Sequence, residues 1–176
     1  LELRRERTEH EQSRELLRQS QRLADVGGFA YDPETGELLW TDQTYDLFGL
    51  SPETEVDVDT AVDFYTPESR SIIEPEVDRL LEEGGAYDLE LDAVTADGER
   101  RLVRTIAEAQ RENDETTQIV GALQDVTEQH RDRRLQEWQG AFFEWIATGA
   151  PIDAVLDEIA RFAEEELSGA TVSILK

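Results

Sequence analysis

Acidic side chains supply almost all of the groups in this sequence that could do acid–base chemistry. The 176 residues include 42 Asp and Glu, only two His and no Cys. Two facing carboxylates can serve as a general acid and a general base, but among so many acids close pairs arise by coincidence. The sequence has no Ser/His/Asp arrangement, glycine-rich phosphate loop or metal-binding helix motif. We therefore predict neither catalytic residues nor a metal site.

The two histidines, His10 and His130, lie in polar segments that are typical of solvated helices. A lone histidine lacks the companion ligands that a metal site needs. The residues around His130 do not resemble the acceptor motif of a histidine kinase. The absence of cysteine excludes disulfides, thiolate metal sites and cysteine nucleophiles.

The net charge of −25 is spread along the chain rather than gathered in one run, and Lys176 is the only lysine. The acids could mark a site for cations or for a basic partner. They could also form a solvated surface suited to high salt, where ions screen the self-repulsion. The even distribution favours the second, halophilic interpretation. Such a surface repels phosphates, so we expect no direct binding of nucleic acid.

The chain has no apolar run of membrane-spanning length and no visible signal peptide. We expect a cytoplasmic location without membrane contact.

Four segments can be separated along the chain. Residues 1–25 are rich in Arg, Glu and Gln and predict a helical arm, either a solvated lead-in or one arm of a weak dimer stalk. Residues 26–128 hold the central domain. Residues 129–149 predict a connecting helix, and residues 150–176 predict an amphipathic helix followed by a strand.

The central domain begins with a predicted hairpin, whose strands start at Phe29 and at Glu37. Asp42 then begins a short helix that stops at Gly49. A second helix begins at Thr66-Pro67, and Pro75 predicts a break or kink because proline lacks an N–H group.

Three further strands are predicted at residues 87–93, 101–109 and 117–127, joined by tight turns at Asp97-Gly98 and Asn113-Asp114. Strands joined by tight turns are antiparallel. The fold class is therefore α+β, with a five-stranded antiparallel sheet that carries short helices on one face and is flanked by N- and C-terminal helices.

The order of several short segments resembles that of the PAS sensory domain. These segments are Ala24–Phe29, the turn Asp32–Gly36, Trp40–Leu50, Asp97-Gly98 and Asp125-Val126-Thr127. Thr66 stands where the commonest variant of the family has a histidine. Residues 150–176 look like the truncated start of a GAF domain. The acidic composition is similar to that of halophilic archaeal sensors.

The resemblance implies a pocket between the sheet and the short helices. Strand parity and family analogy predict that it is lined by Trp40, Tyr45, Phe48, Phe64, Leu89, Leu91, Ile106 and Leu123. The alternative is that these side chains simply fill the core. A cysteine-linked flavin and a histidine-ligated haem are excluded by the residues present, whereas a non-covalent flavin or a small aromatic ligand stays open.

The resemblance also implies a signal-transmitting hinge at Asp125 and Thr127, where the last strand meets the exit helix. Thr127 is expected to cap that helix. The alternative is a cap that only stabilises. The exit helix carries an apolar seam formed by Leu135, Trp138, Phe142 and either Trp145 or Ile146, and we expect a homodimer through the flanking helices.

The sequence therefore predicts a regulatory sensor and relay module of a multidomain signalling protein, upstream of a histidine kinase or a helix-turn-helix transcription regulator. It would sense a small molecule or a redox state. The alternative is a ligand-free dimerisation or partner-docking scaffold. A hydrolase with paired carboxylates is a third class, and it predicts two acids that face each other in a cleft with perturbed pKa values.

Overall fold

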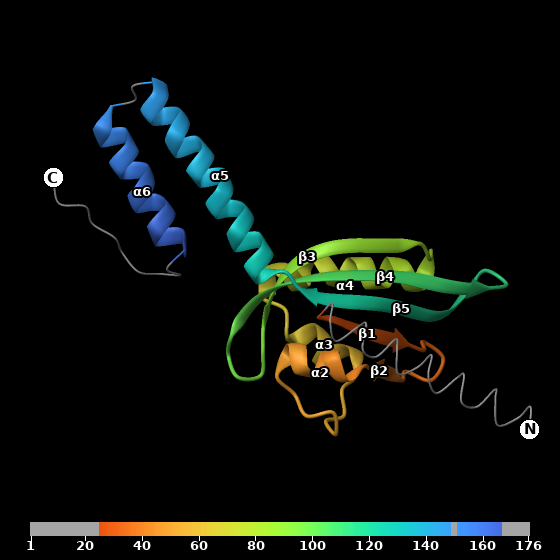
Figure 1. Ribbon diagram of the computed structural model, residues 1–176. Coiled ribbons are helices and arrows are strands. Elements are labelled where there is room, and N and C mark those ends of the chain that lie inside the picture. The colour runs from red at the N-terminus through yellow and green to blue at the C-terminus, as the bar shows by residue number, and fades with distance from the viewer. Residues whose placement is uncertain (1–24, 149–150, 167–176) are drawn as a thin grey trace, which may run out of the picture. The chain divides into compact units, whose positions relative to one another are not determined.

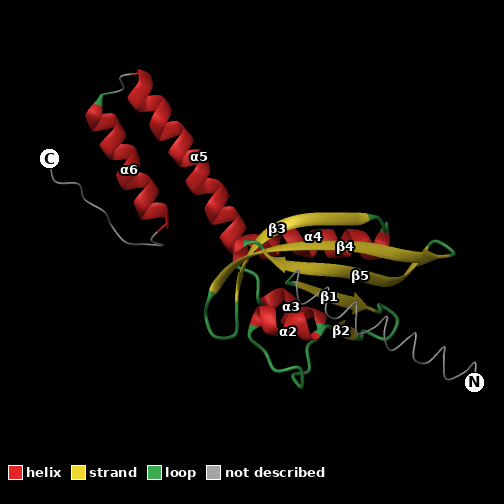
Figure 2. Cartoon of the chain, in the orientation of Figure 1, coloured by secondary structure: helices red, strands yellow, loops and turns green. Residues whose placement is uncertain are grey.

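The computed structural model describes residues 25–148 and 151–166. The chain divides into two units with the boundary between Glu128 and Gln129. In the first unit, helices cover one face of a five-stranded sheet (Figures 1 and 2). The predicted N-terminal arm, apart from Asp25, and the predicted strand at residues 171–175 lie outside the described residues.

The sheet has the strand order β2-β1-β5-β4-β3, and every neighbouring pair is antiparallel. The predicted α+β fold class is confirmed. The strands are β1 (Val26–Tyr31), β2 (Leu38–Trp40), β3 (Ala86–Val94), β4 (Arg100–Glu112) and β5 (Glu115–Asp125).

The first strand includes Gly27 and Gly28, which precede its predicted start at Phe29. A Cβ atom at Gly27 would lie 2.5 Å from the hydroxyl oxygen of Thr44, so only glycine lets the following helix approach the strand this closely. The β4–β5 turn is formed by Asn113 and Asp114, which both have positive φ, at 51° and 66°. This is the backbone that a two-residue hairpin loop requires.

Three helices cover the inner face of the sheet: α2 (Asp42–Phe48), α3 (Val58–Asp63) and α4 (Pro67–Glu82). Gly49, with φ 71°, ends α2 as predicted. Thr66 caps α4 by accepting a hydrogen bond from the N–H of Ser69 at 3.4 Å.

The predicted break at Pro75 is wrong, because α4 runs without interruption through that residue. Proline removes the hydrogen bond to the carbonyl four residues earlier, at Ser71. Ser71 and Pro75 are both exposed, so water can take the place of the missing donor. The helix therefore tolerates a proline that a buried position would not.

The core lies between the sheet and these helices, in two adjoining clusters. One is centred on the buried residues Phe48, Leu91 and Val103, and the other on Leu80 and Ile119. Phe29 packs against both clusters. Burial of this apolar surface is the main stabilising term for the sheet and its helices.

Two helices follow the sheet: α5 (Thr127–Thr148), which begins at the end of the first unit, and α6 (Ile152–Glu166). Among the described residues, neither of these nor any other helix is both long and apolar enough to cross a membrane.

Candidate functional site

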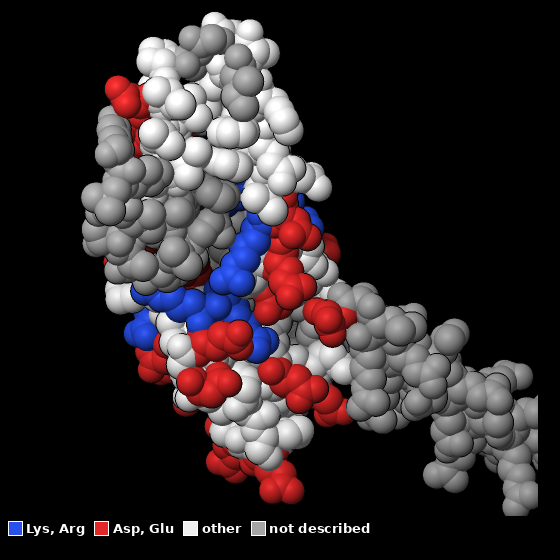
Figure 3. Space-filling model, turned by 60° about the vertical axis from the view of Figure 1, so that its left-hand side comes forward, with Lys and Arg blue, Asp and Glu red and all other residues white. Residues whose placement is uncertain are grey.

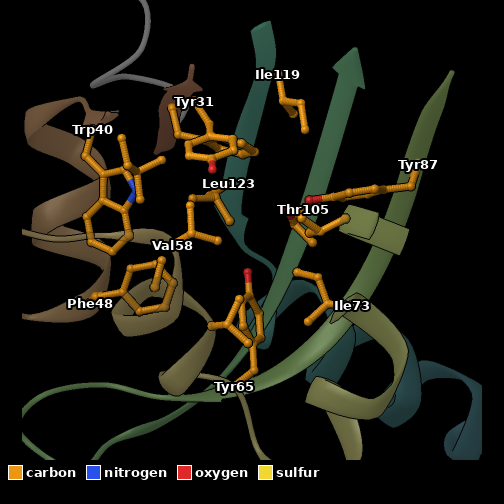
Figure 4. Close-up of a pocket in the computed structure, with 15 residues that line it drawn as sticks. Tyr31, Trp40, Phe48, Val58, Tyr65, Ile73, Tyr87, Thr105, Ile119 and Leu123 are labelled. Carbon is orange, nitrogen blue, oxygen red and sulfur yellow. The ribbon is translucent and has the colours of Figure 1, made fainter. Parts of the chain in front are cut away.

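A cavity of about 70 Å³ lies between the inner face of the sheet and the helices (Figure 4). Its walls carry six aromatic rings and no charged side chain. The lining residues are Phe29, Tyr31, Leu38, Trp40, Phe48, Val58, Ala61, Val62, Tyr65, Ile73, Val77, Tyr87, Thr105, Ile119 and Leu123. An apolar cavity with a few polar tips is the usual composition of a small-ligand site.

Strand alternation places the wall residues of the sheet. Phe29 and Tyr31 are two residues apart on β1 and so share its inner face. Across the ladder, Phe29 pairs with Gly121 and Tyr31 pairs with Ile119. A Cβ atom at Gly121 would lie 2.4 Å from the Phe29 ring, so the missing side chain is what leaves room for this ring beside β5.

The polar groups of the cavity are hydroxyls. Figure 4 shows the hydroxyl ends of Tyr31 and Tyr65 directed into the cavity and that of Tyr87 directed toward Thr105. Burial raises the pKa of Tyr65 well above its ordinary value, the neighbouring Tyr87 adds to this, and a hydrogen bond with Thr105 opposes it. Burial likewise raises the pKa of Tyr87, against the effect of Thr105. Both phenols therefore stay protonated and uncharged at neutral pH.

The structure brings part of the predicted pocket together. Trp40, Phe48 and Leu123 line the cavity. Tyr45 and Phe64 lie behind that wall, with their rings 5.3 Å and 6.4 Å from the ring of Trp40.

Two predicted residues of β3 belong to the core without reaching the cavity. Leu91 is buried, and Leu89 packs against both core clusters. These two side chains therefore fill the core, which was the alternative to their lining a pocket.

The placement of Ile106 in the pocket is wrong. Its side chain lies on the outer face of the sheet and is 40% exposed, whereas Thr105 is buried and lines the cavity. Ile106 pairs with the exposed Asp88, while Thr105 pairs with Leu89. Side chains alternate between the two faces of a strand, so only one of these neighbours could face inward.

The three tyrosines of the cavity were not predicted. Tyr87 has the same parity on β3 as Leu89 and Leu91, so strand alternation alone could have identified it. Tyr65 lies between α3 and α4, where no periodicity applies, and only its bridge to Ala93 on β3 places it.

The size of the cavity limits what it can hold. Pockets for drug-sized ligands usually measure about 300–1,000 Å³, against about 70 Å³ here. The cavity in this conformation is several times smaller than such pockets. The sequence also lacks the cysteine that a covalent flavin adduct needs. A ligand of a few non-hydrogen atoms is compatible with the cavity as described.

A second feature joins the cavity wall to the start of α5. Nη1 of Arg101, on β4, donates to the carbonyl oxygen of Leu47 at 3.1 Å and lies 3.6 Å from a carboxylate oxygen of Asp125. Nη2 of Arg101 donates to Glu99 at 2.7 Å. Leu47 directly precedes the cavity residue Phe48. We call these contacts the Arg101–Asp125 network.

The same carboxylate of Asp125 holds the first residue of α5. Its Oδ1 accepts from the N–H of Thr127 at 2.9 Å and from the Thr127 hydroxyl at 2.6 Å. The Thr127 hydroxyl in turn accepts from the N–H of Leu102 at 2.9 Å. The expected cap by Thr127 is therefore wrong: Asp125 supplies the acceptor, and Thr127 ties the helix start to β4.

The predicted seam of α5 is partly described. The rings of Trp138 and Phe142 stack with centroids 5.2 Å apart. Leu135 is 43% exposed, and Phe143, which was not predicted, is 68% exposed. The side chain of Ile146 lies outside the described residues.

Carboxylates are distributed over several parts of the visible surface (Figure 3). Several of these carry depressed pKa values because of local partners. The guanidinium of Arg104 lowers the pKa of Asp88, and the hydroxyl of Thr95 lowers that of Asp97. In the described part of the chain, no group of three or more His, Cys, Asp or Glu is arranged to hold a metal ion.

We compared the chain with known protein families, curated sequences and solved structures. Residues 37–123 match the family described as the PAS fold. No curated protein sequence gives a significant match.

Several solved structures have a similar fold at low sequence identity. One is a sensory box histidine kinase/response regulator from Burkholderia thailandensis E264, with 21% identity, a TM-score of 0.59, and coverage of 73% of this chain and 97% of that one. Another is the N-terminal domain of a diguanylate cyclase with PAS/PAC sensor from Marinobacter aquaeolei, with 17% identity, a TM-score of 0.55, and coverage of 60% and 98%.

A third is an RNA-binding light-oxygen-voltage receptor, with 20% identity and a TM-score of 0.57. The match covers 74% of this chain but only 36% of the receptor.

Proposed function

Because residues 37–123 have the PAS fold, we propose that this chain is a sensor and relay module of a multidomain signalling protein. The module senses a small molecule or a redox state in the cavity and passes the change to α5. The output is a histidine kinase or a helix-turn-helix transcription regulator, and the role of this chain is regulatory rather than catalytic. Similar folds occur in a histidine kinase/response regulator and in a diguanylate cyclase, which supports a signalling role for this chain.

The observation that carries the proposal is the Arg101–Asp125 network. Arg101 contacts the carbonyl of Leu47, and the next residue, Phe48, is a wall of the cavity. Arg101 also faces Asp125, which holds the first residue of α5. A shift of α2 on ligand binding would change one contact of Arg101 and so bias the other. We propose this coupling as the two-state element that a population shift requires.

We propose domain limits that follow the sequence: a helical arm at residues 1–25, the sensor at 26–128, a connecting helix at 129–149 and the start of a GAF-like domain at 150–176. The amphipathic α6 supports the last assignment, with Val155, Leu156 and Ile159 half-buried and Asp153 and Asp157 exposed. The acidic surface supports a halophilic protein. Exposed Leu135 and Phe143 on α5 support dimerisation through the flanking helices.

The test uses the absence of cysteine, which allows two labels to be placed cleanly. Glu108→Cys on β4 and Gln139→Cys on α5 both change exposed residues and accept spin labels. Ala61→Phe then fills the cavity from α3, and Ala86→Phe adds the same ring at an exposed site as the control. We expect Ala61→Phe, and not Ala86→Phe, to change the distribution of distances between the labels.

Arg101→Met provides the second arm of this test. It keeps a long side chain but removes the contacts to Leu47 and Asp125. In that background Ala61→Phe should no longer change the label distances. An unchanged distribution in the presence of Arg101 would refute relay from the cavity to α5.

The second candidate function is a ligand-free dimerisation or docking scaffold. The small volume of the cavity favours it, because most of the interior is already filled. A scaffold predicts that Ala61→Phe leaves both α5 and the output unchanged. Under either function, Phe143→Glu, which places a charge at an exposed position of α5, should abolish the proposed dimer in sedimentation experiments.

A further inference from the structure

A groove between α3 and α4 adjoins the cavity. Val58, Val62 and Val77 line both spaces, so these three side chains form the boundary between them. The groove measures about 440 Å³, and its other lining residues are Asp59, Asp63, Glu74 and Asp78. Any molecule that passes from this groove into the cavity must displace the valines and pass these four carboxylates.

The helix that forms one side of this boundary is weakly held. Helix α3 has six residues, none of which is buried. Its cap is the carboxylate of Asp57, which accepts from the N–H of Thr60 at 2.8 Å. Segments with little buried apolar surface open locally at a small cost in free energy. Outward movement of α3 would join the groove to the cavity.

The charges of the groove select among ligands. Its lining contains four carboxylates and no lysine or arginine. Asp63 is compensated by Arg70, whose Nη1 lies 2.7 Å from it. The potential at this entrance is negative, so it attracts cations and repels phosphates and carboxylates. This argues independently of size against a nucleotide-type flavin.

The aromatic lining of the cavity favours one kind of cation over another. Its lining holds six aromatic rings, from Phe29, Tyr31, Trp40, Phe48, Tyr65 and Tyr87, and no carboxylate that could pair with a cation. Methylated ammonium groups lose little hydration on burial and are attracted by aromatic rings. They are also attracted by hydroxyl oxygens, which the inward-directed ends of Tyr31 and Tyr65 supply. A primary ammonium would lose strong hydration without gaining a counter-ion.

Resting on the sensor function proposed above, we propose that the cavity binds a small methylated ammonium cation, which enters between α3 and α4. The carboxylates of the groove raise its local concentration, and the aromatic walls hold it. Since the cavity is small, the ligand has only a few non-hydrogen atoms, and α3 moves outward to admit it.

The test compares three probes of nearly the same shape and different charge: tetramethylammonium, tert-butanol and pivalate. Binding to the whole chain is measured by isothermal titration calorimetry at fixed ionic strength. We expect tetramethylammonium to bind at least roughly tenfold more tightly than the other two, because several desolvated cation–π contacts add. Equal or tighter binding of tert-butanol, or no binding of any probe, would overturn the proposal.

Two pairs of variants separate the cage from the entrance. Trp40→Phe keeps an aromatic face and Trp40→Leu removes it, so only the second should weaken tetramethylammonium binding by about threefold or more. Asp59→Asn and Asp78→Asn should each weaken binding at least roughly twofold at low salt, and less at high salt. Asp46→Asn, an exposed acid of α2 outside the groove, is the matched control. Equal effects of Trp40→Phe and Trp40→Leu in variants that keep the wild-type melting temperature would refute the cage.

These outcomes are independent of the relay experiment. If tert-butanol binds and changes the distances between the α5 labels, the assigned charge of the ligand is wrong and the sensor function stands. If tetramethylammonium binds without changing those distances, the ligand class stands and the relay is wrong.

Discussion

Asp125 accepts hydrogen bonds from Thr127 at the start of α5 and also carries the charge that faces Arg101. Replacement of Asp125 can separate these two roles. Asp125→Ala removes the acceptor for the N–H and the hydroxyl of Thr127 and also the charge that faces Arg101. Loss of a helix cap costs about 0.5–2 kcal/mol. The ion pair adds about 0.2–1 kcal/mol, because the Arg101 and Asp125 side chains are 25% and 33% exposed and water screens them. We expect Asp125→Ala to lower the free energy of unfolding by about 1–3 kcal/mol.

Asp125→Asn is the matched control. The amide keeps an oxygen where Oδ1 lies, so both bonds from Thr127 remain, while the negative charge and the acceptor that face Arg101 are lost. Its expected cost is about 0.2–1 kcal/mol. The assay is urea denaturation followed by the fluorescence of Trp40, with Trp138 and Trp145 replaced by phenylalanine so that Trp40 is the one remaining tryptophan.

The comparison of the two variants can refute this assignment. Equal losses for Asp125→Asn and Asp125→Ala would show that the charge, and not the cap, stabilises the junction. If Asp125→Ala lowers the free energy of unfolding by less than about 0.3 kcal/mol, the junction does not contribute measurably to stability. Errors in comparing such free energies are of this size.

Three further predictions concern the core and the cavity. Gly121→Ala should lower the free energy of unfolding by about 1–3 kcal/mol, because the new Cβ would lie 2.4 Å from the Phe29 ring. Urea denaturation measures this loss, and an unchanged midpoint would contradict the prediction. Leu80→Ala should lower the free energy of unfolding by about 2–5 kcal/mol, since the Leu80 side chain is 0% exposed. Ile106→Ala should lower it far less, because Ile106 is 40% exposed. Similar losses for the two variants would show that Ile106 is buried in solution. Tyr65 has a pKa raised by burial, so folding favours the protonated phenol. Its stabilising contribution is present below the ordinary pKa of about 10 and declines above it, and Tyr65→Phe should reduce the loss of stability between pH 9 and about pH 11 in thermal melts.

The topology could be predicted from the sequence because its signals are local. Alternation of apolar residues in Tyr87, Leu89 and Leu91 indicates a strand, and tight turns at Gly98 and Asn113 require antiparallel neighbours. Three of eight predicted pocket residues line the cavity, because strand parity alone does not say how deep a side chain lies. The error at Ile106 arose where apolar character was given more weight than parity: the adjacent threonine faces inward.

The contacts that join distant segments could not be read from the sequence. Arg101 reaches the carbonyl of Leu47, 54 positions earlier in the chain. The sequence does not indicate which arginine makes such a contact, because its acceptor is a backbone carbonyl that every residue possesses. The role of Asp125 as an acceptor for Thr127, by contrast, follows from their separation of two residues and was accessible as a local pattern.

Backbone groups at the C-terminal end of β3, on the free edge of the sheet, are occupied by the chain itself. The N–H of Val94 donates to Phe64 at 2.7 Å, that of Thr66 donates to Asp92 at 3.0 Å, and the hydroxyl of Ser69 accepts from the N–H of Asp92 at 3.0 Å. A foreign strand would have to break these bonds before it could extend the ladder. The segment from Phe64 to Ser69 therefore covers residues 92–94 of this edge against pairing with a foreign strand.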